Sequence, residues 1–257
     1  MKKVFFVVAA ALLFCAGGRA LAQSGDFEIT DGVLVKYRGN ATEVRVPDGV
    51  TGIGNRAVSS SKLVSITIPA SVTSIGDDPF PDCWNLTAIR VDQGNPAYMD
   101  RAGVLFTKDL TALICYPGKK TASSYRVPAG IKTIGPNAFA SCRSLVSITL
   151  PAGLAKIGHH AFSYCSLTSM TIPESVTSIG GYAFYGCKDL AEIVLPAGLT
   201  EIEMYTFYEC AKLARITIPA GVREIEYGAF YGCDSLPSAV VTAIRDKFGG
   251  LPFAVGR

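Results

Sequence analysis

A hydrophobic residue followed by proline recurs along most of the chain, and this repeat constrains the fold more than any other feature. The prolines of this step are Pro47, Pro69, Pro128, Pro151, Pro173, Pro196 and Pro219. From Pro128 onward, successive steps are 22 or 23 residues apart. A fixed period of this length is the signature of a protein built from stacked repeats.

Each repeat unit predicts one short strand followed by a turn and an apolar segment. Between Leu145 and Leu236 the units follow the pattern L-x-x-I-x-[IL]-P-x-x-[VL]-x-x-I-x-x-x-A-F-x-x-C. The alternating apolar side chains of I-x-[IL] point to one face of a strand, which the proline ends because it cannot donate to the ladder. One unit cannot bury its apolar face alone, so stacked units are predicted to form a continuous core. We therefore expect a repeat solenoid with one strand per turn.

This unit resembles the leucine-rich repeats of the BspA-like, treponemal type, which share the I-x-[IL]-P strand and the A-F-x-x-C segment. The match is strong over Leu145–Leu236, good over Ser124–Leu145 and weaker over Thr42–Leu86. The resemblance implies a leucine-rich-repeat stack and a binding role without catalysis. Proteins of this type are often found on bacterial surfaces, where they bind host or partner-cell proteins.

The regular repeats are interrupted, and both ends depart from the pattern. Two apolar runs separated by Thr107–Thr111 predict a β-hairpin insert, and the segment Phe27–Val35 is similar to it. We expect a signal peptide at 1–22, an N-terminal hairpin cap at 23–41, first repeats at 42–91, a hairpin insert at 92–124, regular repeats at 125–236, and a C-terminal cap helix and tail at 237–257.

The C-terminal segment has the pattern of a helix with one apolar face. Four apolar residues recur at every fourth position: Leu236, Val240, Ile244 and Phe248. Pro237 suits the first turn of this helix and Gly249 its end. Terminal repeats need a cover with a polar outer face, so we expect this helix to cap the stack.

The N-terminus has the layout of a secretory signal peptide. A positive start at Lys2 and Lys3 precedes the uncharged run Val4–Ala16, and Ala20-Leu21-Ala22 supplies a small-residue cleavage site. The run is too short to span a membrane, and we expect no transmembrane segment elsewhere. We predict an exported protein, secreted or on the cell surface; the alternative is a lipoprotein anchored through Cys15, because Leu12–Cys15 resembles a lipobox.

Charge argues against nucleic acid as a partner. Lys2, Lys3 and Arg19 belong to the predicted signal peptide, and without them the remaining basic residues only balance the 21 acidic residues. A neutral mature chain lacks the basic excess that binds phosphate backbones.

Cysteine occupies the same position in successive units, at Cys83, Cys142, Cys165, Cys187, Cys210 and Cys233. Each follows the core phenylalanine position by three residues, and residues one turn apart stand too far apart for good disulfide geometry. We therefore predict a column of buried, reduced thiols.

Motifs of catalysis, metal binding and cofactor binding are missing from the sequence. His159 and His160 are the only histidines, and no C-x-x-C, nucleophile elbow or phosphate-binding loop is present. Gly135, Gly158 and Gly180 recur at the repeat period and are predicted to be turn glycines. We interpret recurring pairs such as Glu201 and Glu203 as a solvated face. We expect no enzyme activity, no metal and no cofactor.

Tyrosines that recur with the repeat are the candidate binding residues. Tyr185, Tyr208 and Tyr231 directly follow the core phenylalanine in three successive units, and Tyr182 and Tyr205 precede it by two positions. The period stacks them into two columns on one flank, and tyrosine is enriched at interfaces. We predict an exported, non-catalytic protein that binds a host or other cell-surface protein through these five tyrosines. An envelope-associated structural scaffold without a foreign partner is the alternative, and the oligomeric state stays open.

Overall fold

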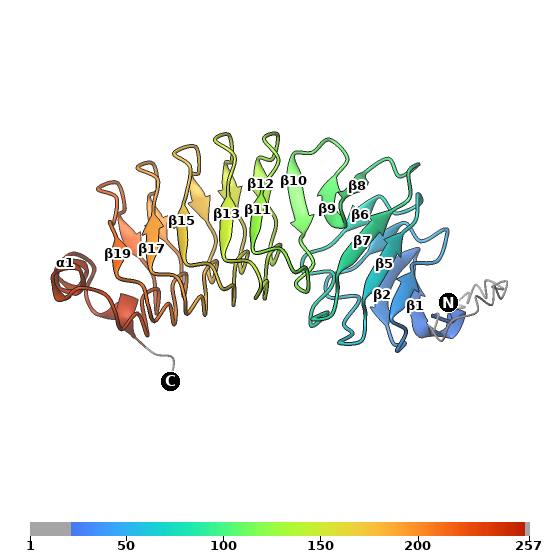
Figure 1. The fold of residues 1–257 in the computed structure, drawn as a ribbon, viewed down its shortest axis with the longest axis horizontal. Coiled ribbons are helices and arrows are strands. Elements are labelled where there is room, and N and C mark those ends of the chain that lie inside the picture. The colour runs from blue at the N-terminus through green and yellow to red at the C-terminus, as the bar shows by residue number, and fades with distance from the viewer. Residues whose placement is uncertain (1–21, 255–257) are drawn as a thin grey trace.

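The computed structural model describes residues 22–254 and shows a leucine-rich-repeat solenoid (Figure 1). The predicted fold class is confirmed. The predicted signal peptide, with Cys15, lies outside the described residues except for Ala22. A 3-10 turn (Ser24–Asp26) begins the described chain.

Two rows of strands run along the solenoid. The first row contains the strands predicted from the repeat: β3 (Glu43–Arg45), β5 (Ser65–Ile68), β7 (Ala88–Val91), β11 (Ser124–Arg126), β13 (Ser147–Thr149), β15 (Ser169–Thr171), β17 (Glu192–Val194) and β19 (Arg215–Ile216). The second row contains two-residue strands that follow in each turn: β4 (Gly52–Ile53), β6 (Ser74–Ile75), β12 (Thr133–Ile134), β14 (Lys156–Ile157), β16 (Ser178–Ile179), β18 (Glu201–Ile202) and β20 (Glu224–Ile225). Each row is divided into several short sheets, and the repeat strands that pair within them do so in parallel, in the register that the repeat dictates. Met170 of β15 is paired with Ile193 of β17, which is paired with Ile216 of β19.

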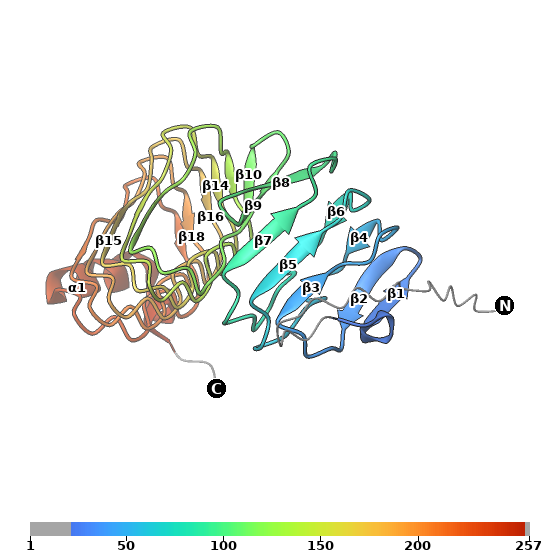
Figure 2. The same cartoon turned by 45° about the vertical axis from the view of Figure 1, so that its right-hand side comes forward.

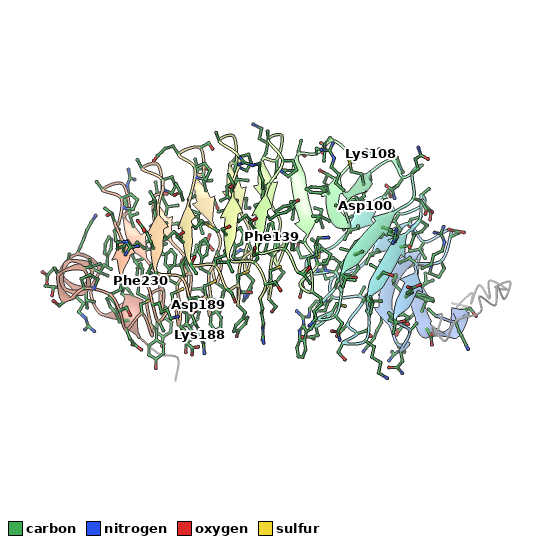
Figure 3. The ribbon with its side chains drawn as sticks, in the orientation of Figure 1. Asp100, Lys108, Phe139, Lys188, Asp189 and Phe230 are labelled. Carbon is green, nitrogen blue, oxygen red and sulfur yellow. The ribbon has the colours of Figure 1, made fainter. Side chains whose placement is uncertain are left out.

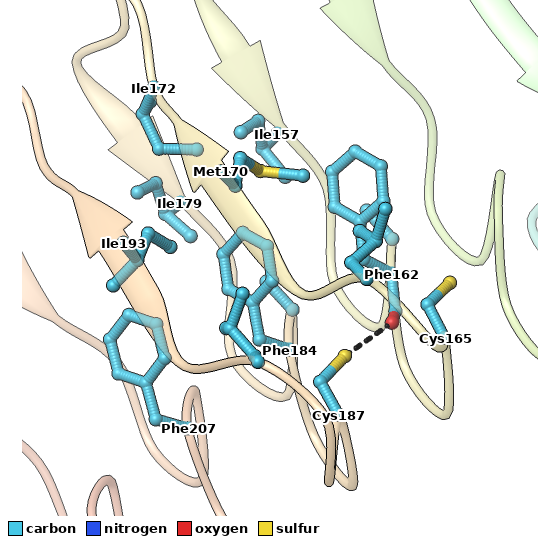
Figure 4. Packing of buried hydrophobic residues seen from close by; sticks show 14 of the residues in the cluster. Ile157, Phe162, Cys165, Met170, Ile172, Ile179, Phe184, Cys187, Ile193 and Phe207 are labelled. Carbon is cyan, nitrogen blue, oxygen red and sulfur yellow. Dashed lines mark hydrogen bonds between the residues drawn. The ribbon is translucent and has the colours of Figure 1, made fainter. Parts of the chain in front are cut away.

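The phenylalanines of the A-F-x-x-C segment form one stacked column inside the solenoid. They are Phe139, Phe162, Phe184, Phe207 and Phe230, all fully buried or nearly so. Centroids of neighbouring rings are 5.1 to 5.5 Å apart, and the ring planes differ by 6° to 17°. Because identical rings recur at the spacing of the turns, each one packs against the next (Figure 4).

The cysteine column is buried, and its thiols serve as hydrogen-bond donors between turns. The Cys187 thiol donates to the Phe162 carbonyl at 3.0 Å, as Figure 4 shows, and Cys210 donates to the Phe184 carbonyl at 3.2 Å. Cys165 and Cys233 repeat the bond in their own turns. A thiol at this position therefore fills a small apolar site and also bonds a backbone oxygen of the preceding turn.

The native thiols are expected to resist alkylation by iodoacetamide at about pH 8, because the thiolate is the reactive form. Burial raises the pKa of Cys187 and of Cys210 well above 9.0, and raises that of Cys233 to about 12. After unfolding without reductant, mass spectrometry is expected to show alkylation at every cysteine from Cys142 to Cys233. A bridge between adjacent turns would contradict the buried-thiol interpretation.

Two hairpins of one type interrupt or precede the repeats. β1 (Phe27–Thr30) and β2 (Val33–Tyr37) are joined through Asp31 and Gly32, while β8 (Tyr98–Arg101) and β9 (Val104–Thr107) are joined through Ala102 and Gly103. Both connections have two successive positive φ angles, of 50° and 78° in the first and 49° and 77° in the second. This geometry matches the twist of a two-residue hairpin.

The hairpin insert has one strand more than the sequence predicted. The predicted hairpin across Thr107–Thr111 is present, because β9 pairs antiparallel with β10 (Ala112–Cys115). The first apolar run, however, is itself folded at Gly103 into β8 and β9. The expected two-stranded insert is therefore corrected to three strands, and its β10 continues into the second row by parallel pairing with β12.

The core is divided at the insert, which differs from the continuous core that the repeat predicted. Val104 and Leu105 are adjacent in β9, yet Val104 packs in the C-terminal hydrophobic cluster and Leu105 in the N-terminal one. Because successive side chains of a strand point to opposite faces, β9 acts as a wall with a core on either side. Figure 2 shows β3, β5 and β7 on one side of β9 and the C-terminal turns on the other.

The C-terminal helix is present as predicted. α1 (Ser238–Phe248) begins after Pro237, and Ile244 on its apolar face is buried. The 3-10 segment Leu251–Phe253 then continues the stack, because the Phe230 N–H donates to the Pro252 carbonyl at 2.8 Å. The last turn of the solenoid is thus closed by backbone hydrogen bonds as well as by the helix.

Candidate interaction surface

The five predicted tyrosines lie together in two columns of contacting rings. In one column, the ring centroids of Tyr182 and Tyr205 are 4.9 Å apart. In the other, the centroids of Tyr185 and Tyr208 are 4.8 Å apart, and those of Tyr208 and Tyr231 are 4.9 Å apart. The repeat places each ring against its equivalent in the next turn, as in the phenylalanine column.

Cross-contacts join the two columns into one surface. Tyr182 and Tyr185 have centroids 5.7 Å apart, and Tyr205 and Tyr208 have centroids 5.3 Å apart in an edge contact. His160 stands one turn earlier and stacks on Tyr182 at 4.4 Å. These rings form a continuous aromatic surface rather than separate exposed side chains.

Sequence reasoning missed two members of this aromatic surface. Tyr164 is 47% exposed and makes an edge contact with Tyr185 at 5.3 Å, and Tyr227 makes an edge contact with Tyr205 at 5.6 Å. Neither stands at the repeat position of the other tyrosines, so a search by period passed over them. From here on, the aromatic surface means His160, Tyr164, Tyr182, Tyr185, Tyr205, Tyr208, Tyr227 and Tyr231.

Local backbone geometry explains how the rings lie flat against the turns. Tyr182 and Tyr205 have positive φ angles of 60° and 54°. Glycines of the next turn leave room for the rings, because a Cβ on Gly186 would lie 2.7 Å from the Tyr164 ring and one on Gly228 would lie 2.5 Å from the Tyr205 ring. Glycine is therefore required at these two positions for two reasons: it leaves space for the neighbouring tyrosine ring, and it adopts a positive φ angle without strain.

Charged side chains border the aromatic surface. Lys188 and Asp189, labelled at the lower edge of the molecule in Figure 3, belong to the turn that follows Tyr185. Each pairs with a residue of the next turn: Lys188 with Glu209 at 3.6 Å, and Asp189 with Lys212 at 2.7 Å. Aromatic residues beside a polar rim are the usual composition of a protein interface.

Tyr185 and His160 of the aromatic surface are uncharged near neutral pH. Burial, together with the neighbouring Tyr164 hydroxyl, raises the pKa of Tyr185 to about 12. Burial, and to a lesser extent His159, lowers the pKa of His160. At these two residues a partner therefore meets a neutral ring, and the Tyr185 hydroxyl can donate and accept hydrogen bonds.

The paired carboxylates have a different role from the solvated face that the sequence suggested. Glu201 is exposed, but Glu203 is partly buried, and its carboxylate accepts the Gly181 N–H at 2.6 Å. Glu226 accepts the Met204 N–H in the same way, at 2.7 Å. These two side chains tie one turn to the preceding one.

Among residues 22–254, no group of three or more histidine, cysteine, aspartate or glutamate side chains could hold a metal ion. Within the same range, no helix is long and apolar enough to cross a membrane. The described residues instead present a broad aromatic face that charged side chains border.

Comparison with known families identifies the repeat. The model of the BspA-type leucine-rich repeat region matches residues 35–102 and 114–237, with six copies. The chain belongs to the BspA-type leucine-rich repeat family. The break in the match falls inside the hairpin insert, where it contains β9 and the first residues of β10.

Two solved structures of bacterial proteins share the fold of this BspA-type protein, and a third is similar to it in sequence. One from Eubacterium ventriosum is 26% identical with a TM-score of 0.60, covering 76% of this chain and 71% of its own. The pneumococcal vaccine antigen PcpA is 18% identical with a TM-score of 0.51, covering 84% and 68%. The T. pallidum leucine-rich repeat protein is 26% identical with a TM-score of 0.48, covering 88% and 95%. A search of curated proteins found no match.

Proposed function

We propose that this BspA-type protein is exported and binds another protein, without catalysis, through the aromatic surface. The observation that carries the proposal is the continuous set of ring contacts across successive turns. Stacked repeats present extended surfaces to macromolecules, and tyrosine supplies large contact area at low conformational cost. The pattern of the N-terminal residues supports export to the cell surface or the medium.

The aromatic surface differs from ordinary exposed aromatic side chains because its rings contact one another and form one patch. Single apolar side chains on a surface are common, whereas contiguous patches mark interaction sites. Most rings here are only partly buried, so their faces and hydroxyls remain available to a partner. The ion pairs at Lys188 and Lys212 provide a polar rim that would exclude water around the contact.

A pull-down with residues 23–257 against extracellular-matrix and cell-surface proteins tests this function. We expect a saturable partner, and the triple variant Tyr185/Tyr208/Tyr231→Ala is expected to weaken its binding at least about thirtyfold, equivalent to one hot spot of about 2 kcal/mol. The affinity of both proteins for the captured partner is the measurement, and circular dichroism checks that the variant is folded.

The matched control replaces three exposed threonines at equivalent positions of the repeat, Thr149/Thr171/Thr217→Ala. This control is expected to keep the affinity of the unaltered protein. A partner that the tyrosine variant binds equally well would move the site away from the aromatic surface. If no partner is captured, the structural-scaffold alternative is favoured instead.

A further inference from the structure

The turns of this solenoid are joined by a third line of backbone hydrogen bonds, outside the two strand rows. In a regular turn, the Phe139 N–H donates to the Ala161 carbonyl at 2.8 Å and the Ser141 N–H donates to the Ser163 carbonyl at 2.8 Å. Equivalent bonds recur in the following turns, and the last of them run from Gly228 to the Leu251 carbonyl and from Phe230 to the Pro252 carbonyl. Each turn therefore donates backbone N–H groups to carbonyl oxygens of the following turn.

This line is interrupted at the turn before the insert. Asp78, Phe80 and Asp82 occupy the donor positions of that turn; Asp78 and Asp82 have φ angles of 47° and 56°, close to the 55° of Asn137 and 60° of Ser141. Within residues 22–254, no carbonyl or side chain accepts the N–H group of any of these three residues. The turn thus presents an open edge of backbone donors.

The insert causes the break because its turn is too short to cover that edge. Leu113 is paired with Ile134 and Ser124 with Ser147, yet the chain between Leu113 and Ser124 is shorter than that between Ile134 and Ser147. The insert therefore reaches the following turn through Tyr116, whose N–H donates to Ala138, but leaves the Asp78–Asp82 edge without acceptors.

A cleft of about 240 Å³ lies between this edge and the insert. Trp84 lines it and is 63% exposed, the most exposed of the large apolar side chains among the described residues. Tyr116 also lines the cleft, and its buried hydroxyl has no hydrogen-bond partner among those residues. Tyr164 lines the opposite side, where the cleft meets the aromatic surface.

The charge of the cleft favours a cation. Asp78 pairs with Arg56, so that carboxylate is already neutralised. Asp82 also lines the cleft, is exposed, and has no cationic partner among residues 22–254; its carboxylate accepts from the Ser59 hydroxyl at 3.4 Å. An indole beside an unpaired carboxylate is a favourable site for a lysine or arginine side chain.

We propose that this cleft binds an extended segment of a partner protein that carries a lysine or arginine. The segment takes the place of the turn that the solenoid lacks. Its carbonyl oxygens accept the N–H groups of Asp78, Phe80 and Asp82, while its cationic side chain lies beside Asp82 and the Trp84 indole. Strand addition at an open edge works in this way, with backbone bonds giving affinity and side-chain contacts giving specificity. The site does not include Tyr185, Tyr208 or Tyr231, the residues whose replacement tests the proposed function.

Hydrogen exchange tests the open edge directly. In the free protein, the amides of Asp78, Phe80 and Asp82 are expected to exchange roughly a hundredfold faster than the paired amides of Phe139 and Ser141. The measurement is residue-resolved exchange on residues 23–257. Equal protection of the two sets would show that the edge is already paired, and would overturn the proposal.

Binding is tested with a random library of 12-residue peptides displayed on phage and selected on immobilised residues 23–257. The selected peptides are expected to share a basic residue. Synthetic copies are expected to slow exchange at Asp78, Phe80 and Asp82 and to change the emission of Trp84, which is the only tryptophan of the chain. Selected peptides that lack a basic residue, or leave the emission and the three amides unchanged, would refute the site. Failure to enrich any peptide would do the same.

Variants of exposed residues test whether the peptide binds in the cleft or on another surface. Asp82→Asn is expected to weaken peptide binding roughly threefold, as for an exposed ion pair, and Trp84→Ala at least about tenfold. Asp77→Asn is the matched control, because Asp77 is exposed in the same turn and does not line the cleft. The Tyr185/Tyr208/Tyr231→Ala variant is expected to bind the peptide normally. Loss of binding in Asp77→Asn, or unchanged binding in Trp84→Ala, would contradict the proposal.

Discussion

Replacing Phe184 by alanine is expected to destabilise the protein by about 3–5 kcal/mol, as for a fully buried phenylalanine. Phe184 has no exposed surface and stands in the middle of the ring column. Its centroid is 5.5 Å from those of Phe162 and Phe207, and each of these two rings is within 8° of parallel to it. Truncation therefore removes two stacking contacts and leaves a cavity between rigid neighbours.

The free energy of unfolding in guanidinium chloride, followed by circular dichroism, measures the effect. Because each turn contacts mainly its neighbours, the C-terminal turns are expected to lose structure first, which would appear as a broadened or two-step transition. The matched control is Val194→Ala, where the side chain is 45% exposed on β17 and a change within about 0.5 kcal/mol is expected. A loss below about 1 kcal/mol for Phe184→Ala would mean that its packing is misassigned.

The second large effect is expected for Gly158→Ala, with a loss of about 3 kcal/mol from overpacking. A Cβ at Gly158 would lie 2.7 Å from the Pro136 nitrogen and 2.8 Å from the Gly135 carbonyl carbon. Both are backbone atoms of the preceding turn, so the clash is relieved only by separating the two turns. That separation would weaken the parallel pairing of β12 with β14.

Gly198→Ala is the matched control, because a Cβ at Gly198 has no atom within 4 Å. Its φ is outside the left-handed region, so this substitution is expected to be neutral or slightly stabilising through the unfolded chain. Thermal unfolding of the two variants gives the comparison. Similar melting temperatures for Gly158→Ala and Gly198→Ala would show that the turns can move apart without cost.

The sequence pattern correctly marks positions that require glycine, but the structure shows a different physical reason for the requirement. Gly135, Gly158 and Gly180 recur with the repeat and were predicted to be turn glycines. None has a positive φ angle. What requires glycine is the approach of the neighbouring turn, as at Gly180, where a Cβ would lie 2.7 Å from the His159 nitrogen. The contact partner is a full turn away, so the local sequence does not reveal it.

The candidate surface was predictable in part for the same reason. Tyr185, Tyr208 and Tyr231 recur at one repeat position, and a solenoid must stack equivalent positions. Tyr164 and Tyr227 join the surface from other positions, through edge contacts with Tyr185 and Tyr205. These two tyrosines belong to the aromatic surface because of how neighbouring turns pack, and the repeat period does not predict this.

The sequence by itself determined the solenoid, its parallel register, the phenylalanine and cysteine columns and the C-terminal helix. The reason is that a repeat makes every contact between turns a copy of the same contact, so the period alone specifies it. Only the tertiary structure decided what happens at the insert, where no copy exists. There β9 divides the core at Val104 and Leu105, and the short turn that follows leaves the Asp78–Asp82 edge open. Both features depend on how the length of the insert compares with that of the turns beside it, and the repeat does not specify this length.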